Sequence, residues 1–187
     1  MEPVDRLYTI DGLPVQVSAQ GPPDGRTVVL LDMSRTAGSP YQELRDRLHV
    51  AKVQTVGISA RSPLSDKAIV AILDSLSIRC AVLVGDGRCA EIAWLTAAHH
   101  PQRITGLVVI DGGHPGTAHN DSGDALCPQV FADTTALVSS RGAGSIARAS
   151  RRHVRGDFRI ADLAGTRGSR HFIAQLSTEI VMHTLSV

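Results

Sequence analysis

Short apolar runs alternate along the chain with longer segments in which apolar residues recur at helical spacing. The runs predict β-strands over residues 8–10, 15–18, 27–31, 50–56, 80–84, 104–110, 135–139 and 158–163. The segments with helical spacing predict α-helices over residues 41–48, 67–76, 90–99, 146–153 and 172–185. Runs that are apolar throughout are typical of strands covered on both faces. The alternation therefore predicts an α/β fold, with a mostly parallel sheet and helices on both of its faces.

The first two predicted strands depart from this alternation. They flank Asp11-Gly12, a dipeptide favoured in tight hairpin turns, so we expect them to pair in antiparallel fashion. The segments 57–65 and 112–129 are polar and predict loops. A chain of 187 residues has the usual size of one domain, and residues 1–187 are expected to form a single unit.

Composition narrows the partners expected for this chain. The net charge is +1 with no basic block, and aromatic residues make up only 3%, which argues against a nucleic-acid surface. No apolar run approaches the roughly 18 residues that a membrane span needs, and the first ten residues lack the apolar core of a secretory signal. The three cysteines, an odd number, are expected to be reduced thiols, which predicts a cytoplasmic protein.

The most specific pattern in the sequence is AVLVGDGRCAEIAWLTAAHHPQRITGLVVIDGGHP, residues 81–115. It resembles the nucleophile-elbow region of the α/β-hydrolase fold, which reads strand, G-x-S-x-G, alanine-rich helix, H-P-x-R-V and strand. TIDGLPVQVSAQGP is similar to the opening hairpin of this family, and SRHFIAQLS is similar to its terminal segment with the catalytic histidine. The resemblance spans roughly residues 8–182 and implies an α/β-hydrolase-like domain. The short link between residues 110 and 135 predicts that this domain has no cap.

The residues that carry covalent hydrolysis in this family are replaced. Gly87 stands at the nucleophile position, where it keeps the strained turn but offers no attacking group. Asp32-Met33 stands where the family has His-Gly, and a carboxylate there would repel a developing oxyanion. Residues 141–145, at the expected place of the triad acid, include no carboxylate. Only His171 has a counterpart in the triad, so the sequence predicts that the protein is not a serine hydrolase.

Three titratable side chains are the candidate catalytic residues. Asp32, Asp86 and His171 are expected at the carboxyl ends of the strands, where ligands bind in open α/β sheets. Together they could move protons without a covalent intermediate, as a lyase, isomerase or cyclase does. The candidate ligand-binding residues, for a small apolar ligand, are Met33, Gly87, Arg88, Asp111 and His114. No ligand spacing is diagnostic of a metal, so neither a metal nor a cofactor is predicted.

Several of these residues have competing interpretations. Asp86 could be a displaced nucleophile, but Val84 and Arg88 would then occupy the two positions that the tight turn reserves for small residues. Cys89 lies at a helix N-terminus, which would lower its thiol pKa, although a small residue there is also needed for packing. Asp111 either orients the histidine or begins an Asp-Gly-Gly turn.

A dinucleotide-binding domain is an alternative. Gly85, Gly87 and Ala90 fit the pattern G-x-G-x-x-A after a strand, and Asp111 ends the next strand, where such domains place a ribose-binding acid. The fingerprint usually opens the first strand–helix–strand unit, whereas two strand–helix units precede it here. The α/β-hydrolase resemblance therefore explains more of the chain.

A protein-binding scaffold is the second alternative. Without a cap, the strand ends are expected to expose apolar surface, and such patches often mark partner sites. The partner is then either another protein or a second copy of this chain in a homodimer. The sequence thus leaves two partner classes open, a small-molecule ligand and a protein, and predicts no nucleic-acid or membrane partner.

Overall fold

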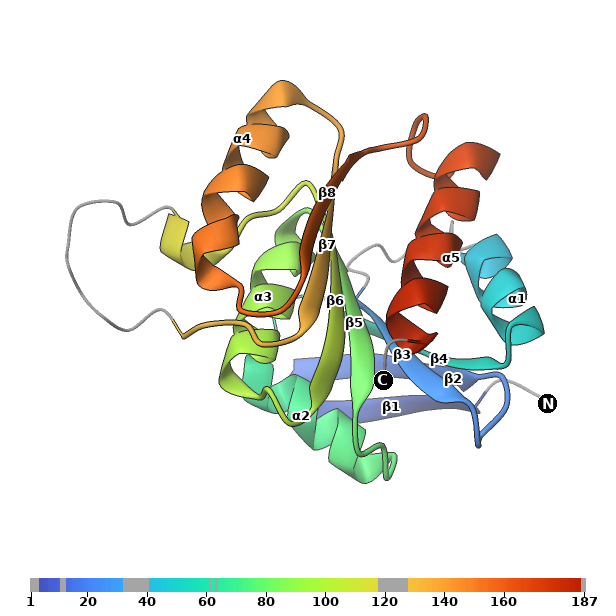
Figure 1. The fold of residues 1–187 in the computed structure, drawn as a ribbon. Coiled ribbons are helices and arrows are strands. Elements are labelled where there is room, and N and C mark those ends of the chain that lie inside the picture. The colour runs from blue at the N-terminus through green and yellow to red at the C-terminus, as the bar shows by residue number, and fades with distance from the viewer. Residues whose placement is uncertain are drawn as a thin grey trace.

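A computed structural model describes residues 4–10, 13–31, 41–60, 62, 64–117 and 128–185 of the chain. In these ranges eight strands form one sheet, in the order β1-β2-β4-β3-β5-β6-β7-β8 (Figure 1). The strands are β1 (Val4–Ile10), β2 (Leu13–Gln20), β3 (Arg26–Leu31), β4 (Val53–Ala60), β5 (Ala81–Asp86), β6 (Ile104–Ile110), β7 (Asp133–Val138) and β8 (Phe158–Asp162).

The sheet combines an antiparallel edge with a parallel body. β1 and β2 pair in antiparallel fashion from Val4–Ala19 to Ile10–Leu13, as the sequence predicts, while the turn residues 11–12 lie outside the described part. β2 is also antiparallel to β4, whereas all neighbours from β4 to β8 are parallel. The carboxyl ends of the parallel strands therefore share one edge of the sheet.

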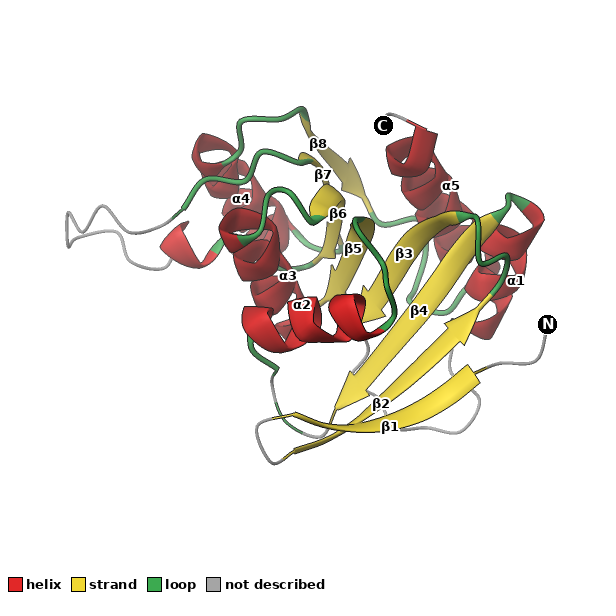
Figure 2. Ribbon diagram, turned by 90° about the horizontal axis from the view of Figure 1, so that it is seen from below, coloured by secondary structure: helices red, strands yellow, loops and turns green. Residues whose placement is uncertain are grey.

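Helices cover both faces of the sheet (Figure 2). The α-helices are α1 (Gln42–Val50), α2 (Asp66–Ser75), α3 (Arg88–His99), α4 (Arg141–Ser150) and α5 (Arg170–Leu185), with short 3-10 helices at η1 (Pro115–Thr117) and η2 (Arg151–His153). The core beneath α2, α3 and α4 includes the buried side chains of Ile69, Trp94 and Ala147. The core beneath α1 and α5 includes Leu44 and Phe172. The prediction of a mostly parallel, two-sided sheet is confirmed.

Several predicted boundaries are wrong. The strand expected at 50–56 begins later, because α1 extends to Val50 and β4 starts at Val53. The loop expected from residue 57 begins later too, because β4 continues to Ala60 and pairs with β2 on one side and with β3 on the other. The helix expected from residue 146 begins at Arg141, because the Oγ of Ser140 caps it by accepting a 3.1 Å hydrogen bond from the N–H of Ala143. Only the first of these segments, residues 57–65, had been predicted as a loop from its polar composition.

The domain has no cap. β6 ends at Ile110 and β7 begins at Asp133, and the described part of the link between them contains one 3-10 turn. A link of this length cannot hold a separate domain. None of the helices in the described ranges is long and apolar enough to cross a membrane.

Candidate functional site

Gly87 forms the turn between the end of β5 and the start of α3. Its φ of 54° and ψ of −113° lie in a region that side chains rarely adopt and glycine adopts without a Cβ penalty. The N–H of Gly87 donates to the carbonyl of Ile110 at 2.8 Å, and its own carbonyl accepts from the N–H of Ala90 at 3.1 Å. The sharp strand-to-helix turn expected from the sequence is therefore present.

Gly85 and Cys89 bring the strand and the helix of this turn close together. A Cβ at position 85 would lie 2.5 Å from the carbonyl oxygen of Cys89 and 2.8 Å from the Cβ of Ala93. Cys89 is itself buried in the core beneath α3. At position 87 the opposite holds, because a Cβ there would meet no atom within 4 Å. The nucleophile position thus has room for a side chain that the sequence does not provide.

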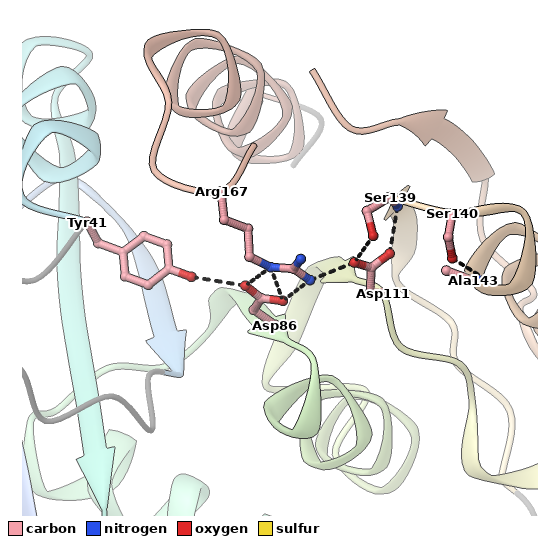
Figure 3. A network of polar contacts seen from close by, with 7 residues as sticks. All are labelled: Tyr41, Asp86, Asp111, Ser139, Ser140, Ala143 and Arg167. Carbon is pink, nitrogen blue, oxygen red and sulfur yellow. Dashed lines mark hydrogen bonds and ion pairs between the residues drawn. The ribbon is translucent and has the colours of Figure 1, made fainter. Parts of the chain in front are cut away.

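Arg167 lies at the centre of the polar network beside this turn (Figure 3). It belongs to the loop between β8 and α5. Its Nε lies 2.8 Å from Oδ2 of Asp86, and its Nη2 lies 2.8 Å from Oδ1 of the same carboxylate. Nη2 also donates to Oδ2 of Asp111 at 2.6 Å. One guanidinium therefore joins the ends of β5 and β6 to the loop that follows β8.

Asp111 is fixed from a second side by Ser139, at the end of β7. The backbone N–H of Ser139 donates to Oδ1 of Asp111 at 2.7 Å, and its hydroxyl donates to Oδ2 at 2.5 Å. Burial acts to raise the pKa of Asp111, but the hydrogen bonds from Ser139 and Arg167 outweigh it, so this pKa lies below its usual value. The same residue has a φ of 50° and begins the turn that the sequence suggested.

The network holds Arg167 firmly in its charged form. Hydrogen bonds to Asp86, and then to Asp111, raise the pKa of the guanidinium against the opposing effect of burial. On the other side of Asp86, the hydroxyl of Tyr41 makes a long 3.5 Å contact with Oδ2. Two carboxylates share one guanidinium, so the cluster carries a net charge of −1 when all three are ionised.

His171 does not join this network. It is the second residue of α5 and is exposed to solvent. Within the described part of the chain, its imidazole makes no hydrogen bond or ion pair with Asp86 or Asp111; the partner of both carboxylates is Arg167. Asp32 and Met33, the other expected members of the site, lie outside the described residues.

His114 lies in the packing beneath α4 rather than in the network. Its ring is buried and stacks on His153 at a centroid distance of 4.3 Å. Nδ1 accepts a hydrogen bond from the N–H of Gly116 at 3.1 Å, so Nε2 is the nitrogen that donates to the carbonyl of Pro128 at 3.2 Å. Burial, followed by the charge of His153, lowers the pKa of His114 to about 4. The ring is therefore neutral near pH 7, with both nitrogens engaged.

An open cleft of about 390 Å³ lies on the α2 and α3 side of the turn. Its described lining comprises Leu31, Ile58, Ala60, Ser62, Leu64, Ile69, Arg88, Cys89, Glu91, Ile92 and Leu95. Most of these side chains are apolar, and they come from β3, β4, α2, α3 and the loop after β4. Of the expected ligand-binding residues that the structure describes, which are Gly87, Arg88, Asp111 and His114, Arg88 is the one that lines this cleft.

Comparison with known proteins identifies the fold. No protein-family model matches the sequence, and no curated protein is significantly similar to it. Among solved structures, epoxide hydrolase A of Mycobacterium thermoresistibile aligns with a TM-score of 0.71 and 10% identity, over 97% of this chain and 98% of the other. An epoxide hydrolase of Vigna radiata aligns with a TM-score of 0.72 and 13% identity, over 100% and 99% of the two chains.

A hydrolase of Pseudomonas aeruginosa PA01 aligns equally well, with a TM-score of 0.72 and 13% identity, over 98% of each chain. These matches extend over nearly the whole of this chain. The chain has the α/β-hydrolase fold. At such low identity the likeness concerns the fold alone and carries no activity over to this α/β-hydrolase-fold protein.

The dinucleotide-binding alternative is not favoured. The turn through Gly85 and Gly87 has the strand-to-helix form of the elbow in the α/β-hydrolase fold, and the three aligned structures named above are hydrolases. Asp111, the candidate ribose-binding acid, is bound instead to Ser139 and Arg167. Gly85 is thus explained by the tight approach of β5 and α3, and Gly87 by the positive φ of the turn between them.

Arg167 is the residue that sequence reasoning missed in this α/β-hydrolase-fold chain. The only local signal is its place between Gly165 and Gly168, which both have positive φ angles, of 78° and 79°. Two glycines so close together allow the backbone of the loop to adopt positive φ angles at both positions, which other residues rarely adopt. The loop directly precedes the segment in which the family resemblance placed His171, but the sequence analysis assigned no role to residue 167.

Proposed function

We propose that this protein is an α/β-hydrolase-fold protein that forms no covalent acyl-enzyme and binds a small apolar ligand in the cleft beside Gly87. One observation carries the first part of the proposal. The nucleophile position is glycine, and Asp86 and Asp111, the carboxylates of the network beside it, are both bound by Arg167. An acyl-enzyme needs an attacking group and a base that activates it, and this arrangement supplies neither.

Non-covalent acid–base chemistry at Asp32, Asp86 and His171 receives less support. Both carboxylate oxygens of Asp86 are already bound by Arg167, Oδ2 at 2.8 Å from Nε and Oδ1 at 2.8 Å from Nη2. The imidazole of His171 makes no bond to Asp86 within the described residues, so the two are not arranged as an acid–base pair. The ion-paired cluster is better suited to holding three segments of the fold together.

The cleft supports the ligand-binding part of the proposal. Its volume of about 390 Å³ lies within the range of roughly 300–1,000 Å³ that is usual for small-molecule sites. Ile92 and Leu95 of α3 are only partly buried, and both line the cleft. Covering such apolar surface contributes about 25 cal/mol per Å², so an apolar ligand would gain affinity from these walls.

Two measurements on the purified protein test the proposal. Hydrolysis of p-nitrophenyl acetate should remain near the uncatalysed rate, with no burst of product, and His171→Ala should leave it there. Nile red, a neutral apolar dye, should bind with increased fluorescence, and Ile92→Trp should reduce this binding by filling the cleft. Ile146→Trp, on the exposed surface of α4, is the matched control and should bind the dye normally.

Efficient ester turnover that is lost in His171→Ala would contradict the proposal that the protein forms no acyl-enzyme. Failure of the dye to bind would overturn the ligand-binding role and favour the protein-partner scaffold. In that case a homodimer or a stable protein complex should be visible by native mass spectrometry.

A further inference from the structure

Arg88 is the only cationic side chain among the described residues that line the cleft. It is exposed, and no carboxylate in the described part of the chain lies within ion-pair distance of its guanidinium. Arg47, Arg103 and Arg167, by contrast, each pair with an acidic side chain. Among the described residues, the cleft thus presents one guanidinium that has no carboxylate at ion-pair distance.

Arg88 marks one end of the cleft. Arg88, Ile92 and Leu95 are spaced four and three residues apart, which places them along one face of α3. At 1.5 Å per residue, Leu95 lies about 10 Å further along the helix than Arg88. Since α3 begins at the carboxyl edge of the sheet, the cleft has a charged end at that edge and an apolar end between α2 and α3.

We propose that the ligand is an unbranched apolar chain with a terminal carboxylate, with the carboxylate bound by Arg88 and the chain lying against Ile92 and Leu95. This inference rests on the proposed function and names the chemical class of the ligand. A guanidinium binds a carboxylate through two parallel hydrogen bonds, which a neutral head group cannot reproduce. Arg88 is also the first residue of α3, where the helix dipole favours negative charge.

Glu91 is the acidic residue of the same cleft, and its substitution should change decanoate binding in the opposite direction to that of Arg88. It lines the same cleft one turn after Arg88 and carries the charge that would repel an anionic ligand. Arg88→Gln should weaken decanoate binding at least tenfold, equal to about 1.4 kcal/mol. Glu91→Gln should strengthen it severalfold. Arg170→Gln is the matched control, because Arg170 is also an exposed first residue of a helix and does not line the cleft.

The experiment is displacement of bound Nile red by decanoate and by decanol, in the wild type and in each variant, with circular dichroism to confirm folding. Decanoate should displace the dye more effectively than decanol in the wild type, and the difference should vanish in Arg88→Gln. Leu95→Trp shortens the apolar end and should impair decanoate more than hexanoate.

Equal displacement by decanoate and decanol, or no effect of Arg88→Gln, would overturn the assignment of the head group while leaving the apolar-ligand function in place. Binding of the dye without displacement by either compound would also overturn the unbranched-chain ligand. Absence of dye binding would be a failure of the proposed function itself, so the two failures are distinguishable.

Discussion

Arg167 and Asp86 form a two-point ion pair in which Nε and Nη2 each lie 2.8 Å from a different carboxylate oxygen. The two residues are far apart in sequence, and their contact ties the loop after β8 to the end of β5. Asp111 receives Nη2 of the same guanidinium at 2.6 Å. The ion pair therefore occupies the edge of the sheet where an α/β-hydrolase fold ordinarily positions its reacting groups.

Arg167→Gln should destabilise the fold by about 1–2 kcal/mol, because it leaves two neighbouring carboxylates without their shared cation. The Arg167 side chain is 43% exposed, and those of Asp86 and Asp111 are 20% and 16% exposed, so solvent screens part of the interaction. Urea unfolding at low and high salt provides the measurement, and the loss should shrink at high salt. Arg170→Gln, which keeps this network, should unfold like the wild type at both salt concentrations.

Gly87→Ser should fold with a loss of about 1–2 kcal/mol and gain no esterase activity. The side chain has space, since a Cβ meets no atom within 4 Å, but the positive φ is unfavourable for a non-glycine residue. Among the described residues, no imidazole bonds to Asp86 or Asp111, so none is held there as the histidine of a triad would be. Thermal unfolding and hydrolysis of p-nitrophenyl acetate are the measurements. Substantial turnover by this variant would show that a working base and oxyanion site survive beside the turn.

Gly85→Ala should be more damaging, with a loss of about 3 kcal/mol or failure to fold. The new Cβ would lie 2.5 Å from the carbonyl oxygen of Cys89, so α3 would have to move away from β5. Gly142→Ala is the matched control, since its Cβ would approach only the Oγ of Ser140, at 3.9 Å, and helix propensity favours alanine there. Equal stability of the two variants by urea unfolding would refute the tight strand–helix approach.

His114 should make the protein less stable as the pH falls from about 6.5 to about 4. Its pKa is lowered from 6.5 to about 4 in the folded state, so between these values the unfolded chain binds more protons than the folded one. This contribution is fully present above pH 6.5 and declines on acidification. His114→Gln should flatten this part of the curve of unfolding free energy against pH, which urea titrations at several pH values would measure. An unchanged slope would contradict the buried neutral ring.

The architecture could be predicted because buried strands and amphipathic helices leave strong periodic patterns. The runs at β5 and β6 and the glycines between β5 and α3 were sufficient to indicate the α/β-hydrolase elbow. The ends of α1, β4 and α4 could not be placed, since pairing of β4 with β2 and β3 and the cap at Ser140 override local propensity. Tertiary contacts decided these boundaries.

The polar network was the part that sequence could not provide. Asp86 and Asp111 were recognised as titratable residues at strand ends, but their shared partner Arg167 lies in a loop far along the chain. Nothing in an Arg between two glycines specifies which carboxylates it will meet. His171 drew attention through the family resemblance, whereas the structure brings the guanidinium, and not this imidazole, into contact with both carboxylates.

The most direct test of the central claim is mass spectrometry of the protein incubated with p-nitrophenyl decanoate. Native spectra should show one ester bound non-covalently and released on collisional activation, and denatured spectra should show only the unmodified chain. A decanoyl adduct that persists after denaturation would contradict the absence of an acyl-enzyme. A native spectrum without any bound ester would contradict the apolar ligand site.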